Sequence, residues 1–301
     1  MGGIRLQRLV LIIACLFLSA CASLPIAYNN ADLFVRYKVD GHFDLQGSQK
    51  TEFSTRLVRF HQWHRSHELP QYEGLLRAAE RRLADGLTED DVNLTIDAVR
   101  ERYRALVRQV AHDAAPVLST LSPTQIAHLE ERFVEENRKF AKKQRIGESE
   151  EAQVKARIKW MSKQFEDWIG DLTPQQEARI AAMIKATPSL AEPRLEERKR
   201  QQQRFVALLR TQRTPDELAT ALQDLLENME SHRSPAFAAA LREAEPRFVQ
   251  LLLDMDKSLT PSQRAFAITR FGSYAADFRT LARKGRASAG HQASLESVLS
   301  W

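Results

Sequence analysis

The sequence predicts an all-α fold. Apolar residues recur at steps of three and four over most of the 301 residues, which is the spacing of one face of a helix. No run of strand length alternates apolar and polar residues, and clusters of Val, Ile and Thr are absent from the sequence. A single apolar run, near the N-terminus, excludes a polytopic membrane protein, and 43% hydrophobic residues exclude a wholly disordered chain.

Residues 1–20 have the pattern of a lipoprotein signal peptide. Arg5 and Arg8 give a positive start, and the apolar run over 9–18 is too short to span a bilayer. The letters LSAC at 18–21 resemble a bacterial lipobox, in which the cysteine receives a diacylglycerol and the chain is cut just before it. The resemblance implies that Cys21 is the lipid-attachment site and carries acyl chains such as palmitate. An ordinary secretory signal and an uncleaved anchor are the alternatives.

The lipid anchor sets the expected location. Burial of acyl chains stabilises membrane attachment by about 0.8 kcal/mol per CH₂, so two or three chains hold a protein stably. No Asp follows Cys21, which under the enterobacterial sorting rule implies the outer membrane, facing the periplasm. Cys15 leaves with the signal, so the mature chain is expected to have neither a free thiol nor a disulfide. The formal charge of +5 falls to +3 when Arg5 and Arg8 leave, and nucleic acid is not an expected partner.

The mature chain is expected to have three parts. Residues 21–46 should be a tether with a short helix at 32–38, because Ser, Pro, Asn and Gly interrupt the helical pattern there. The helical domain follows over 47–284 as an elongated bundle of antiparallel helical hairpins, which the sequence allows to divide into two sub-bundles near 188–213. Residues 285–301 are rich in Ser, Ala and Gly and should form a loose tail, with room for a short terminal helix.

Five apolar stripes at helical spacing predict the helices of this domain. They are Ile126, Leu129, Phe133 and Phe140; Val154, Ile158, Met161, Phe165 and Trp168; Leu218, Leu222, Leu225 and Met229; Phe248, Leu251, Leu252 and Met255; and Ile268, Phe271, Ala275 and Phe278. Gly147 and Ser149 permit a turn between the first two helices, which should pair as an antiparallel hairpin. Pro246 lies inside the helix predicted over 236–258 and should kink or divide it.

One short phrase, L-[ST]-P-x-Q, recurs along the chain. Three copies begin at Leu121, Leu172 and Leu259, and residues 45–49 form a degenerate fourth copy. Ser or Thr is the expected N-cap, Pro suits the first helical position because its missing N–H is not needed there, and Gln completes a capping box. The helix-start residues are Ser122, Pro123 and Gln125, then Thr173, Pro174 and Gln176, then Thr260, Pro261 and Gln263.

The phrase also resembles the LTxxQ motif of Spy/CpxP-type periplasmic chaperones, which are small helical hairpin proteins that shield unfolded clients or signal envelope stress. This resemblance implies a chaperone-like role. The alternative is that the phrase only starts helices. Because the intervals between copies are irregular, a strict solenoid is not expected.

The stretch from Phe60 to Tyr72 is the most distinctive. It reads FHQWHRSHELPQY, and its WHR, ELP and Y resemble a segment of the DUF6279 type of uncharacterised proteobacterial lipoproteins. The letters YNNAD at 28–32 resemble the N-terminal region of the same family. That resemblance implies no activity. The stretch has polar and aromatic groups beyond what a helix start needs, so we expect it to line a partly exposed binding groove. The candidate groove residues are Trp63, His64, Arg65, Glu68 and Tyr72.

The histidines of this stretch are candidate metal ligands. His61, His64 and His67 are three apart and fan over about 120° of a helix surface, and His42 would add a further ligand. The commoner two-histidine geometry has a spacing of four, and no acid stands at a matching position, so neither a metal nor a cofactor is expected. Arg65 and Glu68 should instead form an ion pair within the helix.

The sequence contains no dinucleotide-, phosphate- or zinc-binding motif and no nucleophile elbow. A cluster of acids on one helix would suit acid–base catalysis in a cell-wall or glycan-acting enzyme, which is the alternative function. Dense charge beside an apolar stripe is more typical of a solvated helix face. These acids are Glu130, Glu131, Glu135 and Glu136.

We therefore expect a lipid-anchored cell-envelope protein with a non-catalytic binding, scaffold or chaperone-like role in the periplasm. Its expected partners are the membrane, through the N-terminal lipid, and an envelope protein, lipid or glycan. Basic clusters at 142–145 and 198–204 would suit anionic lipid headgroups.

Overall fold

The computed structural model describes residues 24–211 and 213–299, with side chains described up to residue 284. Every regular element in these ranges is a helix, which confirms the all-α prediction. The signal peptide and Cys21 lie outside the described residues. The helices are α2 (Leu24–Asn29), α3 (Ala31–Phe43), α4 (Gly47–Trp63), η1 (His64–Glu68), α5 (Leu69–Asp85), α6 (Glu89–Leu118), α7 (Pro123–Lys143), α8 (Glu150–Ile169), α9 (Pro174–Ala186), α10 (Ala191–Arg210), α11 (Pro215–Glu227), α12 (Pro235–Lys257) and α13 (Pro261–Leu299).

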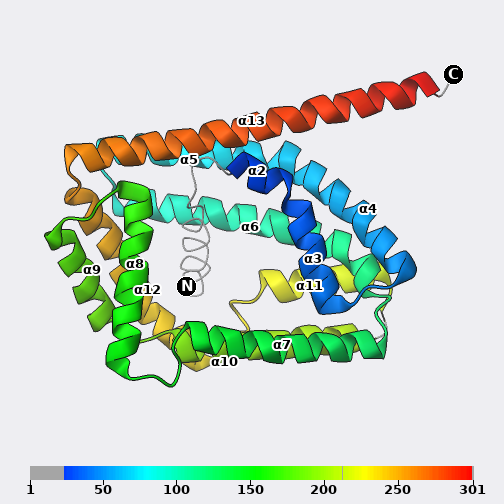
Figure 1. Ribbon diagram of the computed structural model, residues 1–301, viewed down its shortest axis with the longest axis horizontal. Coiled ribbons are helices and arrows are strands. Elements are labelled where there is room, and N and C mark those ends of the chain that lie inside the picture. Colours follow the sequence, from blue (N-terminus) through cyan, green and yellow to red (C-terminus); the bar gives the residue numbers. More distant parts are fainter. Residues whose placement is uncertain (1–23, 212, 300–301) are drawn as a thin grey trace.

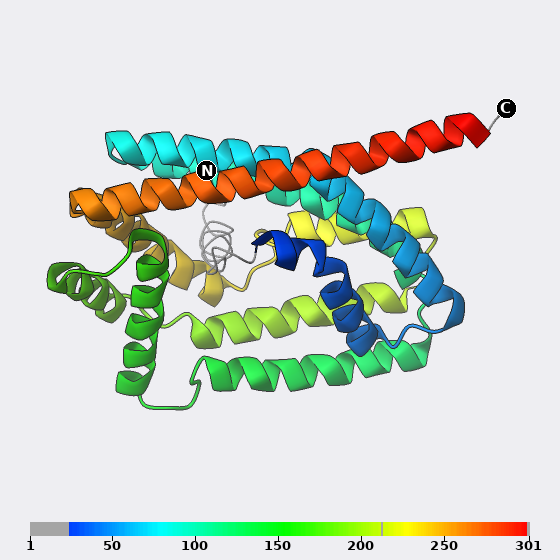
Figure 2. The same ribbon diagram turned by 45° about the horizontal axis from the view of Figure 1, so that its top comes forward.

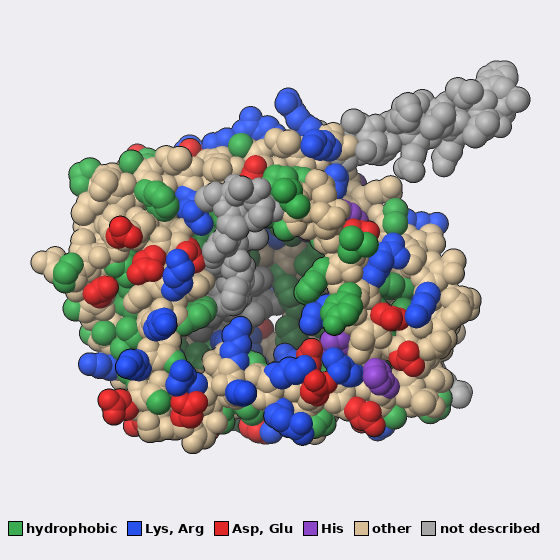
Figure 3. All heavy atoms as spheres, viewed as in Figure 1, with side chains coloured by type: hydrophobic (Ala, Val, Ile, Leu, Met, Phe, Trp, Pro, Cys, Tyr) green, Lys and Arg blue, Asp and Glu red, His purple; other side chains and the backbone are tan. Residues whose placement is uncertain are grey.

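The helices are arranged as a closed frame (Figure 1). α5 and α13 lie side by side along one long side, and α7 and α10 lie along the opposite one. α8 crosses between these sides at one end, and α3 and α4 do so at the other (Figures 1 and 2). α6 runs lengthwise and packs against α11, α4 and α5. The space-filling view shows that this face is hollowed near its middle (Figure 3).

Several separate apolar clusters, distributed around the frame, hold the helices together. The largest joins α8, α9, α12 and α13 around Ile180, Phe248 and Ala267. Smaller clusters join α6 to α11, α7 to α10, and α5 to α13 with α2. Each cluster removes apolar surface from water at one place in the frame, so hydrophobic stabilisation is distributed around it.

The predicted hairpin of the first two stripes is not formed. α7 packs against α10 and α3, whereas α8 packs against α9 and α13. Figure 1 shows α8 crossing the end of α7 instead of lying along it. The turn at 144–149 contains Arg145 and Gly147, both with positive φ, and it redirects the chain to a corner of the frame. The two apolar stripes therefore predicted the helices α7 and α8 but not the helices against which they pack.

Three other segments differ from the expectation. The predicted tether contains two helices, α2 and α3, where a short helix at 32–38 was expected. α12 continues through Pro246 without division. The C-terminal tail was expected to be loose, but α13 continues as far as Leu299. None of the described helices is both long and apolar enough to cross a bilayer.

Candidate functional site

The candidate groove stretch lies where one long helix changes its winding. α4 continues through the π-helical turn η1 into α5 without a break. Pro70 accounts for the wider turn, because proline has no N–H for the carbonyl four residues back and its ring would collide with that carbonyl. The Leu69 N–H instead donates to the His64 carbonyl, five residues back. A π turn changes which residues share a helix face, and such turns are frequent at functional sites.

His64 is the centre of an aromatic cluster on this turn. The Tyr28 hydroxyl, from α2, lies 2.9 Å from His64 Nδ1. The Tyr72 ring meets the His64 ring edge-on at 5.5 Å between centroids, and Tyr72 also packs on Phe278 of α13 at 5.8 Å. The cluster therefore fastens α2 and α13 to the helix that bears the π turn.

Arg65 forms a second link to α2. Its guanidinium lies 5.2 Å from the centroid of the Tyr28 ring and donates a hydrogen bond to Asn29 Oδ1 at 2.8 Å. His61 lies on the preceding turn, with its ring centroid 4.8 Å from that of Tyr28. The two stretches that carry the family resemblance, at 28–32 and 63–72, are thus in direct contact.

Trp63 and Glu68 have other neighbours. Trp63 stacks on His67 at 6.2 Å and contacts Phe60 at 5.7 Å between ring centroids. Glu68 is buried and faces α6, where Arg102 lies 3.5 Å from its Oε1 atom. The predicted ion pair of Glu68 with Arg65 is replaced by this one, because the π turn changes the angular relation of the two residues.

The five predicted groove residues do not share one set of contacts. The structure brings His64, Arg65 and Tyr72 together around α2, while Trp63 and Glu68 have separate contacts. The sequence pattern indicated which residues are unusual, but not that Tyr28 and Arg102 would be their partners. The segment acts as a packed joint between α2, α6 and α13.

Burial sets the protonation of this joint. It lowers the pKa of His64 to about 4, with a smaller contribution from the positive charge of nearby His61. It raises the pKa of Tyr28 to about 12, against the opposing effect of Arg65. At neutral pH, His64 is therefore neutral, and in the tautomer with its proton on Nε2 the Nδ1 atom accepts a hydrogen bond from the protonated Tyr28 hydroxyl. Burial also raises the pKa of Glu68, against the opposing charge of Arg102.

The histidines do not converge on one point. His64 is bonded to Tyr28, His67 stacks on Trp63, and His42 pairs with Glu136 of α7 at 3.1 Å. Within the described ranges, no group of three or more metal-ligating side chains is found. Each of these histidines therefore takes part in a separate contact between side chains.

The recurring phrase starts four helices of the frame. Ser122, Thr173 and Thr260 each accept a hydrogen bond from the N–H of the glutamine three residues on. Each of these glutamines accepts in return from the backbone N–H of the capping residue, at 2.9 to 3.0 Å. In the degenerate copy, Gln49 accepts from the Gln46 N–H at 2.9 Å.

The glutamines of the phrase also pair across the fold. Gln176 and Gln263 exchange two side-chain hydrogen bonds of 2.9 Å, and the second hydrogen of each amide goes to the carbonyl just before the other phrase. Gln49 and Gln125 repeat this pattern, at 3.2 and 2.8 Å. In each pair both amides use two donors and two acceptor positions, so their hydrogen-bonding capacity is filled. We call these two pairs the amide joints.

Three of the four clustered acids of α7 are engaged by basic side chains. Glu130 lies 2.6 Å from Arg210, Glu136 lies 3.0 Å from Arg198, and Glu135 pairs with Lys139 at 2.6 Å and with Arg132. The pairs of Glu130 and Glu136 connect α7 to α10, whereas the Glu135 pairs lie within α7. Exposed ion pairs of this kind each contribute about 0–1 kcal/mol. The geometry is that of a solvated helix interface.

Comparison with known proteins gives one match. The model of a family of unknown function, DUF6279, matches residues 41–238, from α3 into α12. No curated protein and no solved structure matches the chain. The matched range includes the π turn and three copies of the phrase, and it ends before α13.

Proposed function

This chain belongs to the DUF6279 family, and we propose that it is a lipid-anchored protein of the cell envelope with a non-catalytic binding or scaffold role in the periplasm. Cys21 would carry the lipid. The first two described helices would rest on the membrane surface, and the frame would stand beside it.

The observation that carries this proposal is an exposed apolar surface directly after Cys21. Ile26 on α2 is 66% exposed, and Leu33, Phe34 and Tyr37 on α3 are 62%, 62% and 75% exposed. Leu33 and Phe34 each lie within one turn of Tyr37, so the three share a face of α3. Figure 3 shows hydrophobic side chains on this side of the molecule, over α2 and α3. We call these four residues the apolar face.

An apolar face beside a lipid anchor suits an interfacial helix. Such helices bury apolar side chains at the level of the lipid headgroups, and a lipid chain nearby strengthens the attachment. Lys38 is exposed on α3, with its ammonium 5.7 Å from the Phe34 ring, where it would meet anionic headgroups. The hydrogen bond between Tyr28 on α2 and His64 would then hold the frame in a fixed orientation relative to the membrane.

The amide joints favour a scaffold over a chaperone in which the repeated phrase itself contacts clients. Gln125, Gln176 and Gln263 are buried, and their amides are already fully bonded within the fold. A client-binding surface on this protein would therefore lie elsewhere on the frame. The ion-paired acids of α7 likewise give the enzyme alternative no specific support.

The first test concerns the anchor. In cells, Cys21→Ser should leave a protein that is not acylated and no longer enters the detergent phase on partitioning. Retention of a processed, acylated Cys21→Ser protein in the membrane would overturn the proposal.

The second test concerns the apolar face. If Cys15 is removed and Cys21 is acylated, Tyr37→Cys offers a single thiol for an environment-sensitive fluorophore. In vesicles, brominated lipid should quench a label at Tyr37→Cys. It should not quench one at Val134→Cys on α7, which is similarly exposed at 60%. Equal quenching at both positions would contradict the proposed orientation.

A further inference from the structure

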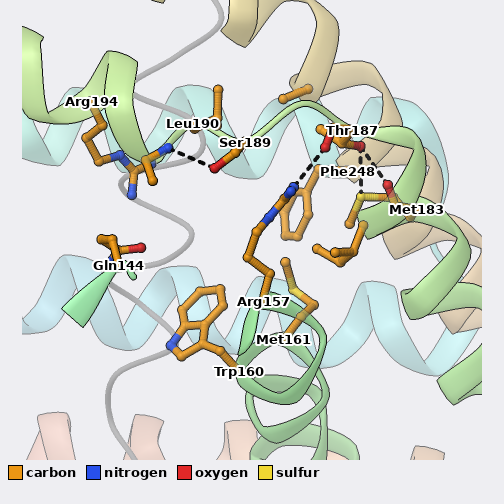
Figure 4. A pocket seen from close by; sticks show the side chains of 13 residues that line it. Gln144, Arg157, Trp160, Met161, Met183, Thr187, Ser189, Leu190, Arg194 and Phe248 are labelled. Carbon is orange, nitrogen blue, oxygen red and sulfur yellow. Dashed lines mark hydrogen bonds between the residues drawn. The ribbon is translucent and has the colours of Figure 1, made fainter. Parts of the chain in front are cut away.

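A cavity of about 130 Å³ lies where α8, α9, α10 and α12 meet. Trp160, Met161, Met183 and Phe248 supply its apolar surface (Figure 4). The loop after α9 closes part of it with Thr187, Ser189 and Leu190. None of the residues around the π turn (63–72) and none of the glutamines of the amide joints lines this cavity.

Two arginines line this apolar cavity. Arg157 comes from α8 and donates a hydrogen bond to the Thr187 carbonyl at 3.0 Å. Arg194 comes from α10, and its buried Nε has no hydrogen-bond partner among the described residues. Figure 4 shows the two side chains entering from different helices, with Trp160 and Gln144 nearby. In the described part of the chain, neither arginine forms an ion pair with a carboxylate.

This arrangement is costly without an anion. Burial lowers the pKa of both arginines, because the charged guanidinium groups lose hydration. The Thr187 carbonyl replaces part of that hydration for Arg157. Elsewhere in the described frame, arginines such as Arg198 and Arg210 have carboxylate partners. A guanidinium in an apolar cavity without a counter-ion is a ready site for a carboxylate or phosphate, which it binds through strong, charge-assisted hydrogen bonds.

We propose that this cavity binds the head of a small anionic amphiphile, with Arg194 on its carboxylate or phosphate and Trp160, Met183 and Phe248 against its hydrocarbon part. The volume suits an anionic group and a few methylenes, so a longer chain would extend out of the cavity. This inference names a ligand class for the proposed binding role and rests on that role. It does not depend on acylation of Cys21.

The test compares short ligands that differ only in their head. The purified full-length lipoprotein is titrated with hexanoate, hexyl phosphate, hexanol and hexylamine, with calorimetry and tryptophan fluorescence as readouts. One of the two anions should bind at least about tenfold more tightly than hexanol, because a hydrogen bond between two charged groups is stronger than one to a neutral hydroxyl. The stronger of the two identifies a carboxylate or a phosphate as the preferred head. Equal binding of hexanol and both anions would overturn the proposal.

Two variants separate a ligand site from a structural role. Arg194→Met should weaken binding of the preferred anion by about tenfold or more and leave the affinity for hexanol unchanged. It should also raise the melting temperature of the ligand-free protein, because it removes a buried charge that lacks a partner. Arg210→Met, on the exposed end of the same helix, should leave anion binding unchanged.

Unchanged anion binding in Arg194→Met would refute the site even if Cys21 is acylated. Conversely, a soluble, unacylated wild-type protein that still binds hexanoate through Arg194 would refute the anchor and retain the site.

Discussion

His64 shows how one buried side chain makes a joint sensitive to pH. Its Nδ1 is an acceptor for the Tyr28 hydroxyl only while the ring is neutral, and its ring lies among Tyr28, Phe60 and Tyr72. Protonation would remove the acceptor and place a charge among aromatic rings. The folded state resists this, which is why the pKa of His64 falls to about 4.

We predict that His64→Phe makes stability less dependent on pH. The unfolded chain binds the proton near pH 6.5 and the folded chain near pH 4, so unfolding is favoured progressively as the pH falls through this window. The free energy of unfolding of the wild type should therefore decrease from pH 7.5 to pH 5, and that of His64→Phe should decrease less. Urea titrations at both pH values measure the difference.

His112→Gln is the matched control, since the His112 side chain is 73% exposed. It should keep the wild-type slope. An unchanged slope in His64→Phe would mean that His64 is already protonated in the folded protein at pH 5.

Gln176 shows why the phrase ends in glutamine and not in glutamate. Its carbonyl oxygen accepts from the Thr173 N–H, as a carboxylate would, but its amide nitrogen also donates to Gln263 Oε1 and to the Ser258 carbonyl. A carboxylate could form the capping box and would then face two acceptors with no hydrogen to offer.

We predict that Gln176→Glu lowers the free energy of unfolding by about 2–6 kcal/mol at neutral pH, since two buried acceptors lose their donor at about 1–3 kcal/mol each. Gln49→Glu should cost clearly less, because Gln49 is only half-buried and water can reach the site. Urea unfolding measures both variants. If neither variant lowers the free energy of unfolding, cross-pairing of the amides does not stabilise the fold.

At the scale of the element, the same phrase performs two separable tasks. The Ser or Thr hydroxyl satisfies a free N–H at the helix start, and the glutamine also connects that start to another helix. The capping task is local, whereas the connecting task links residues more than 70 positions apart.

We predict that Ser122→Ala, Thr173→Ala and Thr260→Ala each cost about 0.5–2 kcal/mol, the usual range for loss of an N-cap. Gln125→Leu and Gln263→Leu should cost more than the cap variants of the same copies, because they also break an amide joint. Thermal and urea unfolding measure both sets. If cap and glutamine variants cost the same, the phrase is only a helix start.

This difference also separates the features that the sequence predicts from those that it does not. The helix starts follow from four or five adjacent letters, because an N-cap and its capping box are local. The pairing of Gln49 with Gln125 could not be deduced, since four copies allow several pairings. Likewise the stripes predicted α7 and α8 but not their partners, because a stripe shows that a helix has an apolar face and not which helix covers it.

The same limit applies to the candidate site, where local features could be predicted but contacts between helices could not. Residues 60–72 are unusual in composition, and Pro70 explains the π turn once the turn is seen. Nothing in the pattern indicates that Glu68 faces Arg102 or that Tyr28 reaches His64, since both depend on how separate helices cross. Arg157 and Arg194 carried no signal at all, because single basic residues on helices usually point to solvent.

At the scale of the whole molecule, the two amide joints lie at opposite ends of the frame. One connects the starts of α4 and α7, and the other connects the starts of α9 and α13 (Figure 1). Separate apolar clusters lie between them. A fold built in this way should respond locally to local damage, since each joint has its own neighbours and contacts.

We predict that the joints act independently. Gln125→Leu should speed hydrogen exchange of backbone amides in the first turns of α4 and α7, and Gln263→Leu should do so in α9 and α13, each leaving the other end protected as in the wild type. Because sites far apart with no shared partners add, the double variant should lose stability by the sum of the single losses, within about 0.5 kcal/mol. Exchange measured by mass spectrometry and urea unfolding test the two halves of this prediction. If either variant exposes both ends, or if the double variant departs from the sum by more than that margin, the frame transmits strain around its whole circumference. A ligand or membrane contact at one end would then change hydrogen exchange at the other end.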